Sequence, residues 1–157
     1  MPTGPALGNT QRELQGMKTK DTYDATTLLA SDARTTTSTG EAAVRLAGMV
    51  RAFAFTLDVT ADESTGLDTL DVFVQTKADG SNWTDVVHFP QHVGNAGLKR
   101  YIEKVIAGPA FAGFEVGTAL AAGEVRDMLG DDWRVRFEIN DDSGSASFTF
   151  SVTACPM

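Results

Sequence analysis

Residues 52–59 read AFAFTLDV, and this stretch decides the fold class. Phe53, Phe55, Leu57 and Val59 alternate with small or polar residues at every second position. Successive side chains of a β-strand point to opposite faces, so this period of two predicts a strand with one apolar face. Such alternation is typical of antiparallel sheets that keep one face in water.

The same period recurs directly downstream. Residues 68–77 read DTLDVFVQTK, with apolar residues at every second position from Leu70. Asp79-Gly80 supplies turn chemistry before NWTDVVHF at residues 82–89. Because a short Asp-Gly loop joins two β-prone segments, we expect them to form a hairpin.

The C-terminal part repeats the pattern twice. Residues 133–139 and residues 148–152 both alternate cleanly between apolar and polar side chains. DDSGS at residues 141–145 lies between them and is rich in turn-forming residues. We expect these two segments to form a second hairpin, the clearest in the chain.

Three further segments are less regular. Residues 98–107 fit both helical and alternating spacing, but their β-prone side chains and the following Gly108-Pro109 favour a strand. Residues 119–129 contain good helix formers, with Gly130 at a helix C-terminal position, so we expect a short helix or a turn there. Residues 26–31 predict one more short strand.

Six or seven short strands, separated by Gly, Asn and Asp turns and with almost no helix, predict an all-β fold. We expect an antiparallel β-sandwich, jelly-roll-like, with an extended N-terminal arm. The strand count also fits a small barrel.

Composition narrows the function classes. The chain has 157 residues, a formal net charge of -8 and one cysteine. An acidic chain is a poor nucleic-acid binder, because affinity for phosphate comes from Lys and Arg. One cysteine cannot form an intrachain disulfide, no run is long enough to span a membrane, and the start lacks the pattern of a signal peptide.

The first 24 residues differ from the rest. Their Lys, Arg, Asp and Glu charges cancel, so the whole acidic excess belongs to residues 25–157, which we expect to be a single β-sandwich domain. Residues 10–17 fit a short capped helix, and the alternative is a flexible terminus. We expect the segment to be a flexible N-terminal arm that orders only against a partner. Its candidate partner-binding residues are Leu7, Leu14, Met17 and Tyr23.

Candidate metal sites are weak. His88 and His92 have the spacing of a helical zinc pair, but Pro90 between them disfavours the helix that would align them. The acidic pairs Asp62-Glu63, Asp131-Asp132 and Asp141-Asp142 do not follow the ligand order of a calcium loop. We therefore expect no metal and no other cofactor.

Signatures of catalysis are missing as well. The chain has no nucleophile elbow, no phosphate-binding loop and no carboxylate pair that its pattern brings together. Cys155 has no basic neighbour in the sequence to activate its thiol. We therefore expect a protein that is not an enzyme. Trp83 or Tyr101 could instead stack on a sugar, which makes a carbohydrate-binding module an alternative.

Several stretches together resemble a known group of proteins. They are TTLLASDARTTT, RAFAFTLDVTA, DTLDVFVQTKADGSNWTDVVHF, KRYIEKVIAG and DDWRVRFEINDDSGSASFTFSVTA, which together span about residues 26–154. Their order is similar to that of small virion proteins of tailed bacteriophages, with β-sandwich or jelly-roll bodies. The resemblance rests on strands and turns and carries over no catalytic residue.

The resemblance implies a capsid decoration, or cement, protein that binds and stabilises the lattice of the major capsid protein. It further implies self-association, with a trimer as the expected state, and a location on the outer capsid surface after synthesis in the host cytoplasm. A minor tail or head–tail joining protein is the nearest alternative. An acidic body suits this role, because it favours solubility and discourages binding to DNA.

Overall fold

The computed structural model describes residues 24–46, 50–62, 65–77, 79–108, 113 and 117–157. These residues form nine strands and no helix, which confirms the all-β prediction. The strands are β1 (Thr26–Arg34), β2 (Val44–Arg45), β3 (Ala52–Asp62), β4 (Thr69–Lys77), β5 (Trp83–His88), β6 (His92–Val93), β7 (Lys99–Ile106), β8 (Asp132–Asn140) and β9 (Phe148–Pro156).

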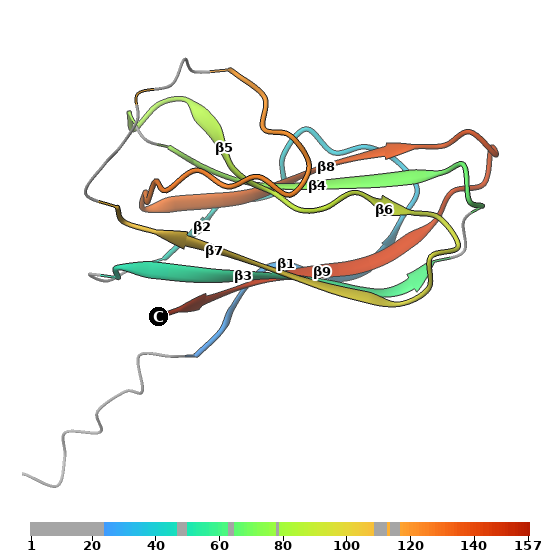
Figure 1. Cartoon of the computed structure of the whole chain (residues 1–157), viewed down its shortest axis with the longest axis horizontal. Helices are drawn as coiled ribbons and strands as arrows, with labels where there is room; N and C mark the ends of the chain where they lie inside the picture. The colour runs from blue at the N-terminus through green and yellow to red at the C-terminus, as the bar shows by residue number, and fades with distance from the viewer. Residues whose placement is uncertain (1–23, 47–49, 63–64, 78, 109–112, 114–116) are drawn as a thin grey trace, which may run out of the picture.

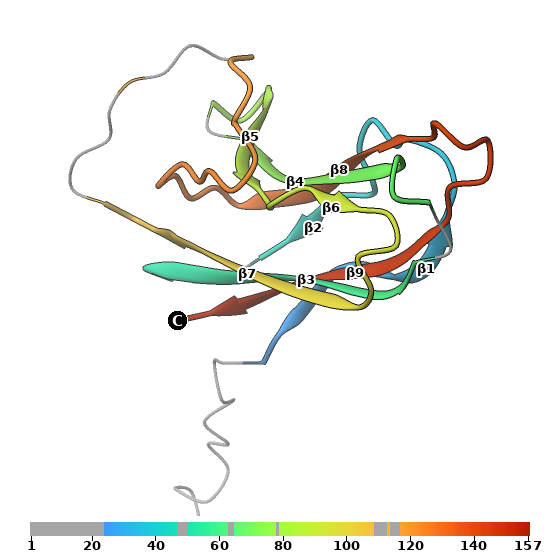
Figure 2. The ribbon, with the colours of Figure 1, turned by 45° about the vertical axis from the view of Figure 1, so that its right-hand side comes forward.

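The strands build two antiparallel sheets that pack face to face as a β-sandwich (Figures 1 and 2). The first sheet has the order β1-β9-β3-β7. The second has the order β2-β8-β4-β5, and β6 pairs with β4 beyond the end of β5. The C-terminal residues lie beside the start of β1, where Thr26 is in register with Ala154 (Figure 1).

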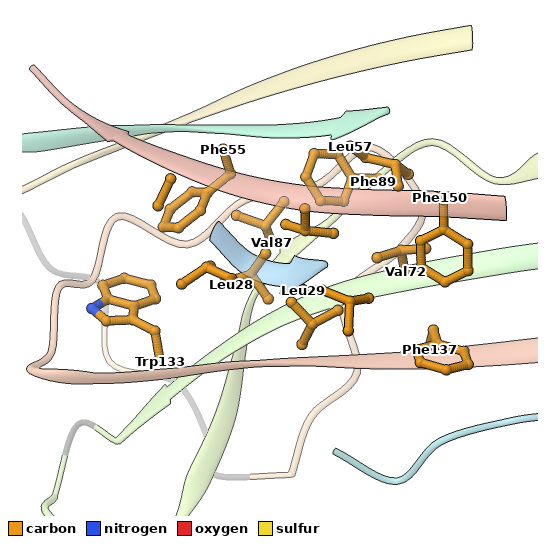
Figure 3. Packing of buried hydrophobic residues seen from close by; sticks show 14 of the residues in the cluster. Leu28, Leu29, Phe55, Leu57, Val72, Val87, Phe89, Trp133, Phe137 and Phe150 are labelled. Atoms are coloured by element: carbon orange, nitrogen blue, oxygen red, sulfur yellow. The ribbon is translucent and has the colours of Figure 1, made fainter. Parts of the chain in front are cut away.

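The core lies between the two sheets and contains the alternating apolar residues of β3, β4, β8 and β9, together with residues such as Leu28, Leu29 and Met128 that the alternation does not predict. Phe55 of the first sheet and Trp133 of the second point toward one another, with their ring centroids 5.1 Å apart (Figure 3). Phe137 and Phe150 meet in the same way at 5.2 Å, edge to face. All four side chains are at most 3% exposed, so burial of aromatic area helps to hold the sheets together.

The chain passes repeatedly between the sheets. Six of the eight connections cross from one sheet to the other, and only β4–β5 and β5–β6 stay within a sheet. The β4–β5 hairpin confirms the first hairpin prediction, with Lys77 in register with Trp83.

The second predicted hairpin is wrong. β8 pairs with β2 and β4 in the second sheet, whereas β9 pairs with β1 and β3 in the first. Alternation fixes which face of a strand is apolar, but two strands of the same pattern can equally well face each other across the core. Residues 141–147 therefore form a corner between the sheets, and the buried carboxylate of Asp68 binds the backbone N–H of Asp142 and Ser143 there.

The irregular segments have mixed outcomes. The expected strands at 98–107 and 26–31 are present as β7 and as the longer β1. The expected helix at 119–129 is wrong, and its alternative, a turn, is present with Gly123 at φ +80°. The residues after this turn bond to the edge of β5, so their backbone groups are satisfied without a helix (Figure 1).

Residues 1–23, with the expected short helix and the candidate residues Leu7, Leu14, Met17 and Tyr23, lie outside the described residues. The predicted arm and its boundary with the sandwich domain stay predictions. In the part of the chain that is described, no helix is long and apolar enough to cross a membrane.

Candidate functional site

His88 ties the segment that follows residue 117 to the second sheet. Its Nδ1 lies 2.9 Å from the carbonyl oxygen of Leu120, and its Nε2 lies 2.9 Å from Asp71 Oδ1. The ring also stacks on Phe73, with centroids 4.0 Å apart. Because the Leu120 oxygen only accepts hydrogen bonds, Nδ1 carries a proton. His88 is 7% exposed, so these contacts are structural bonds within a packed layer.

His92 belongs to a separate cluster. Its side chain is completely buried between the sheets, with Nε2 3.0 Å from Asp62 Oδ2 and Nδ1 3.2 Å from the Tyr101 hydroxyl. The two histidines therefore point to different partners from opposite sides of the second sheet. The described residues contain no group of three His, Cys, Asp or Glu side chains that could hold a metal ion.

Three surface hollows are lined mainly by backbone, Thr, Ser and charged side chains. None of these three hollows is lined by a histidine or a cysteine. One hollow lies on the outer face of the first sheet, between Asp58 and Thr60 of β3 and Leu98 and Arg100 beside and in β7.

The two aromatic residues of the carbohydrate alternative are already in contact with other parts of the protein. The Trp83 ring has the guanidinium carbon of Arg134 4.4 Å and the ammonium nitrogen of Lys77 4.9 Å from its centroid. Tyr101 points into the sandwich toward His92, and burial raises the pKa of its hydroxyl. Each of the two rings thus already has polar or charged partners within the protein.

The most distinctive surface is a row of side chains along β7, which we call the β7 row. Its apolar members are markedly exposed: Leu98 at 71%, Ile102 at 63% and Ile106 at 42%. Two exposed cations, Arg100 and Lys104, alternate with them. Arg100 donates a 2.6 Å hydrogen bond to Asp58 Oδ2 on the neighbouring strand, and this bond with the charge of Asp58 raises the pKa of Arg100.

The outward-facing neighbours of the β7 row are short side chains. Ala54 and Thr56 of β3 and Thr153 and Cys155 of β9 also point outward from the first sheet, and all four are half-buried. Short side chains leave the apolar groups of the β7 row standing above their neighbours. Exposed apolar groups beside a few charges are typical of protein–protein contacts.

The alternation of the β7 row is visible in the sequence, but its exposure as a surface was not predicted. The signal was present: apolar and basic residues share one parity from Leu98 to Ile106, so both kinds lie on one face of the strand. The predicted docking residues Leu7, Leu14, Met17 and Tyr23 belong to the N-terminal arm and lie outside the described residues.

Comparisons of the chain with protein-family models, with curated proteins and with solved structures found no match.

Proposed function

We propose that this chain is a non-enzymatic structural protein of a tailed-bacteriophage particle, a decoration protein that binds the outside of the major capsid lattice and stabilises it. The resemblance in the strand pattern supports the class of particle. The observation that carries the binding role is the β7 row, which exposes three large apolar side chains beside short neighbours. Burial of such groups against a partner is favourable by about 25 cal/mol for each Å² of apolar surface removed from water.

The sandwich is further proposed to be a jelly roll. Its strands pair in a nested way: β1 with β9, β2 with β8, β3 with β7, and β4 with β5. A long hairpin that is rolled up produces this nesting and the two-sheet division that goes with it. Jelly-roll bodies occur in viral capsid proteins and in lectin domains.

A protein partner is favoured over a carbohydrate. Trp83 is stacked on cations of its own sheet, and Tyr101 lies inside the sandwich. The acidic composition discourages contact with the packaged DNA, as suits a protein on the outer surface. A trimer and an N-terminal arm that wraps a neighbour complete the proposal; the trimer follows from the resemblance and the arm from the composition of residues 1–24.

The test is binding of the purified chain to phage heads assembled without it. We expect cosedimentation that saturates at a fixed ratio to the major capsid protein, together with a higher temperature of head disruption. Heads that never bind the chain would contradict the proposal. Location of the chain in the tail or at the head–tail joint, by electron microscopy of the virion, would replace it with the alternative role.

A paired variant tests the surface. Leu98→Ser with Ile102→Ser removes two exposed apolar groups that support no core packing, so the fold should persist. We expect head affinity to fall at least tenfold. Val125→Ser is the matched control, because Val125 is also exposed but lies against the other sheet, and it should leave the affinity unchanged.

A further inference from the structure

β7 leaves backbone hydrogen-bonding groups facing outward at the edge of its sheet. The N–H of Ala107 donates to the carbonyl oxygen of Arg51, which fixes the phase of the β3–β7 ladder. In an antiparallel ladder every second residue bonds to the neighbouring strand, so the odd-numbered residues of β7 bond to β3. The N–H and C=O groups of Arg100, Ile102 and Lys104 therefore point away from the sheet. Ile106 is the next even-numbered residue, and its N–H donates a 3.2 Å hydrogen bond to Asp127 Oδ1 instead of bonding to β3, which confirms this phase.

Among the described residues, the other three sheet edges are each protected against a further strand: one is covered, one is very short and one is irregular. Residues 123–126 cover β5, with bonds such as Arg126 N–H to Val86 O at 2.7 Å. β2 has only two residues. β1 has two register shifts, and its carbonyl oxygens at Ala30 and Asp32 accept hydrogen bonds from the guanidinium of Arg34. Natural sheets protect their edges by such devices, because an open edge invites another strand.

β7 differs from these edges in its regularity. Eight consecutive residue pairs join it to β3 without a register shift. The residues whose backbone groups point outward are also members of the β7 row, so the edge displays a basic, an apolar and a basic side chain in succession. Arg100 already has Asp58 as a partner, whereas no described residue forms a hydrogen bond or an ion pair with Lys104.

We propose that β7 accepts an extended acidic segment of a partner protein as an added strand. The backbone of Arg100, Ile102 and Lys104 would pair with the segment, carboxylates of the segment would lie beside Arg100 and Lys104, and an apolar side chain would pack on Ile102. Addition of a strand to an open edge is a general mode of peptide recognition, in which backbone bonds give affinity and side chains give specificity. The inference rests on the proposed function, since it assigns this segment to the capsid lattice.

A second copy of the chain fits the edge poorly. When two β7 strands pair antiparallel about Ile102, Arg100 of one copy faces Lys104 of the other. Like charges directly opposite each other on neighbouring strands are destabilising. The same charges attract a carboxylate, so the edge discriminates against its own copy and in favour of an acidic strand.

The experiment uses the full chain and two synthetic peptides, Thr-Glu-Val-Glu-Val-Glu-Thr and its counterpart with lysine at each glutamate. We expect the glutamate peptide to slow hydrogen exchange at the amides of Arg100, Ile102 and Lys104 at least tenfold, and the lysine peptide to have no effect. Lys104→Glu should weaken binding of the glutamate peptide at least tenfold. Lys99→Glu is the matched control, since Lys99 is an exposed cation of the same strand with the opposite parity.

Equal effects of the two peptides, or unchanged exchange at saturation, would overturn the proposal. So would a dimer in solution that Lys104→Glu alters. Binding to heads separates this inference from the proposed function. If heads bind the Lys104→Glu variant as tightly as the natural chain, the added-strand inference fails and the decoration role stands. If heads bind neither, the decoration role fails, while the peptide experiment still decides what β7 accepts.

Discussion

The carboxylate of Asp68 accepts two hydrogen bonds from Ser143, 75 residues further along the chain: one from its backbone N–H at 3.0 Å and one from its hydroxyl at 2.8 Å. Asp68 lies just before β4 and is fully buried, and Ser143 lies in the corner between β8 and β9. Thr65 donates two more bonds to the same carboxylate. One ionised side chain thus holds together two connections that pass between the sheets.

This carboxylate predicts a loss of stability in acid. Burial by itself would raise the pKa of Asp68, but the hydrogen bonds from Thr65 and Ser143 outweigh it and lower the pKa from 3.8 to about 2. A carboxyl group with a lowered pKa stabilises the fold above its unfolded value and loses that contribution as the pH falls through the folded value. We expect the urea midpoint to fall between about pH 4 and pH 2, and Asp68→Asn to reduce this pH dependence while lowering stability at pH 7.

Asp79 supplies the control for the acid experiment. Hydrogen bonds from Asn82 and Ser81 lower its pKa to about 2 as well, in the exposed turn between β4 and β5. Asp79→Asn should remove its own part of the pH dependence, and the double variant should be flatter than either single variant. An unchanged acid transition in Asp68→Asn would contradict the assignment.

Two substitutions of Trp133 should lower the stability of the protein by different amounts. Its ring is fully buried and packs edge to face on Phe53 at 5.5 Å, yet its Nε1–H has no hydrogen-bond partner among the described residues. Trp133→Ala should destabilise the protein by about 3–5 kcal/mol through the cavity it leaves. Trp133→Phe should cost about 2 kcal/mol or less, because it keeps an aromatic ring and removes an unpaired buried donor. Equal costs in chemical denaturation would show that Nε1–H has a partner.

His88 predicts a local opening. His88→Phe keeps the stacking on Phe73 but removes both hydrogen bonds, which leaves the Leu120 oxygen without its donor. We expect a loss of about 2–3 kcal/mol and faster hydrogen exchange at the amides of Gly123 and Arg126, which bond to β5. Gln91→Ala is the control, because Gln91 bonds to the same Asp71 from an exposed position. Equal rates of hydrogen exchange at these amides in both variants would show that His88 does not hold this segment on β5.

Gly130 predicts the effect of a single methyl group. A Cβ at this position would lie 3.0 Å from the carbonyl oxygen of Lys77 and closer still to Thr76 Oγ1, which donates a 2.7 Å bond to Asp132 O. Gly130→Ala should destabilise the protein by about 1–3 kcal/mol. In Gly66→Ala the nearest atom would be 3.8 Å away, so that variant should stay within about 0.5 kcal/mol of the natural chain. A thermal melt of both variants checks the pair.

The seven longer strands could be predicted from the sequence, but not the two-residue strands β2 and β6, and their partners only in part. Alternation placed the apolar faces of β3, β4, β8 and β9, and a short Asp-Gly loop identified β4 and β5 as neighbours. The same logic failed for β8 and β9, because the bonds that turn residues 141–147 into a corner come from Asp68, far away in the sequence. Local turn chemistry cannot reveal such a distant partner.

Only part of the candidate site could be predicted from the sequence. The parity of Leu98, Ile102 and Ile106 is a sequence property, but their exposure depends on β7 being the last strand of its sheet. The different hydrogen-bond partners of His88 and His92 likewise depend on which strand runs beside each of them. Both outcomes follow from the order of strands, which no short stretch of sequence contains.

The place of β9 has a consequence for biosynthesis. β9 comes last among the strands in the chain, yet it lies between β1 and β3 in the first sheet. Until the ribosome has made β9, the strand that lies between β1 and β3 in the folded sheet is missing. Pairing of distant segments is slow because a long loop has to close first. We therefore expect the sandwich to assemble only after Phe148–Pro156 has emerged, and a nascent chain halted before Phe148 to depend on chaperones to stay unaggregated.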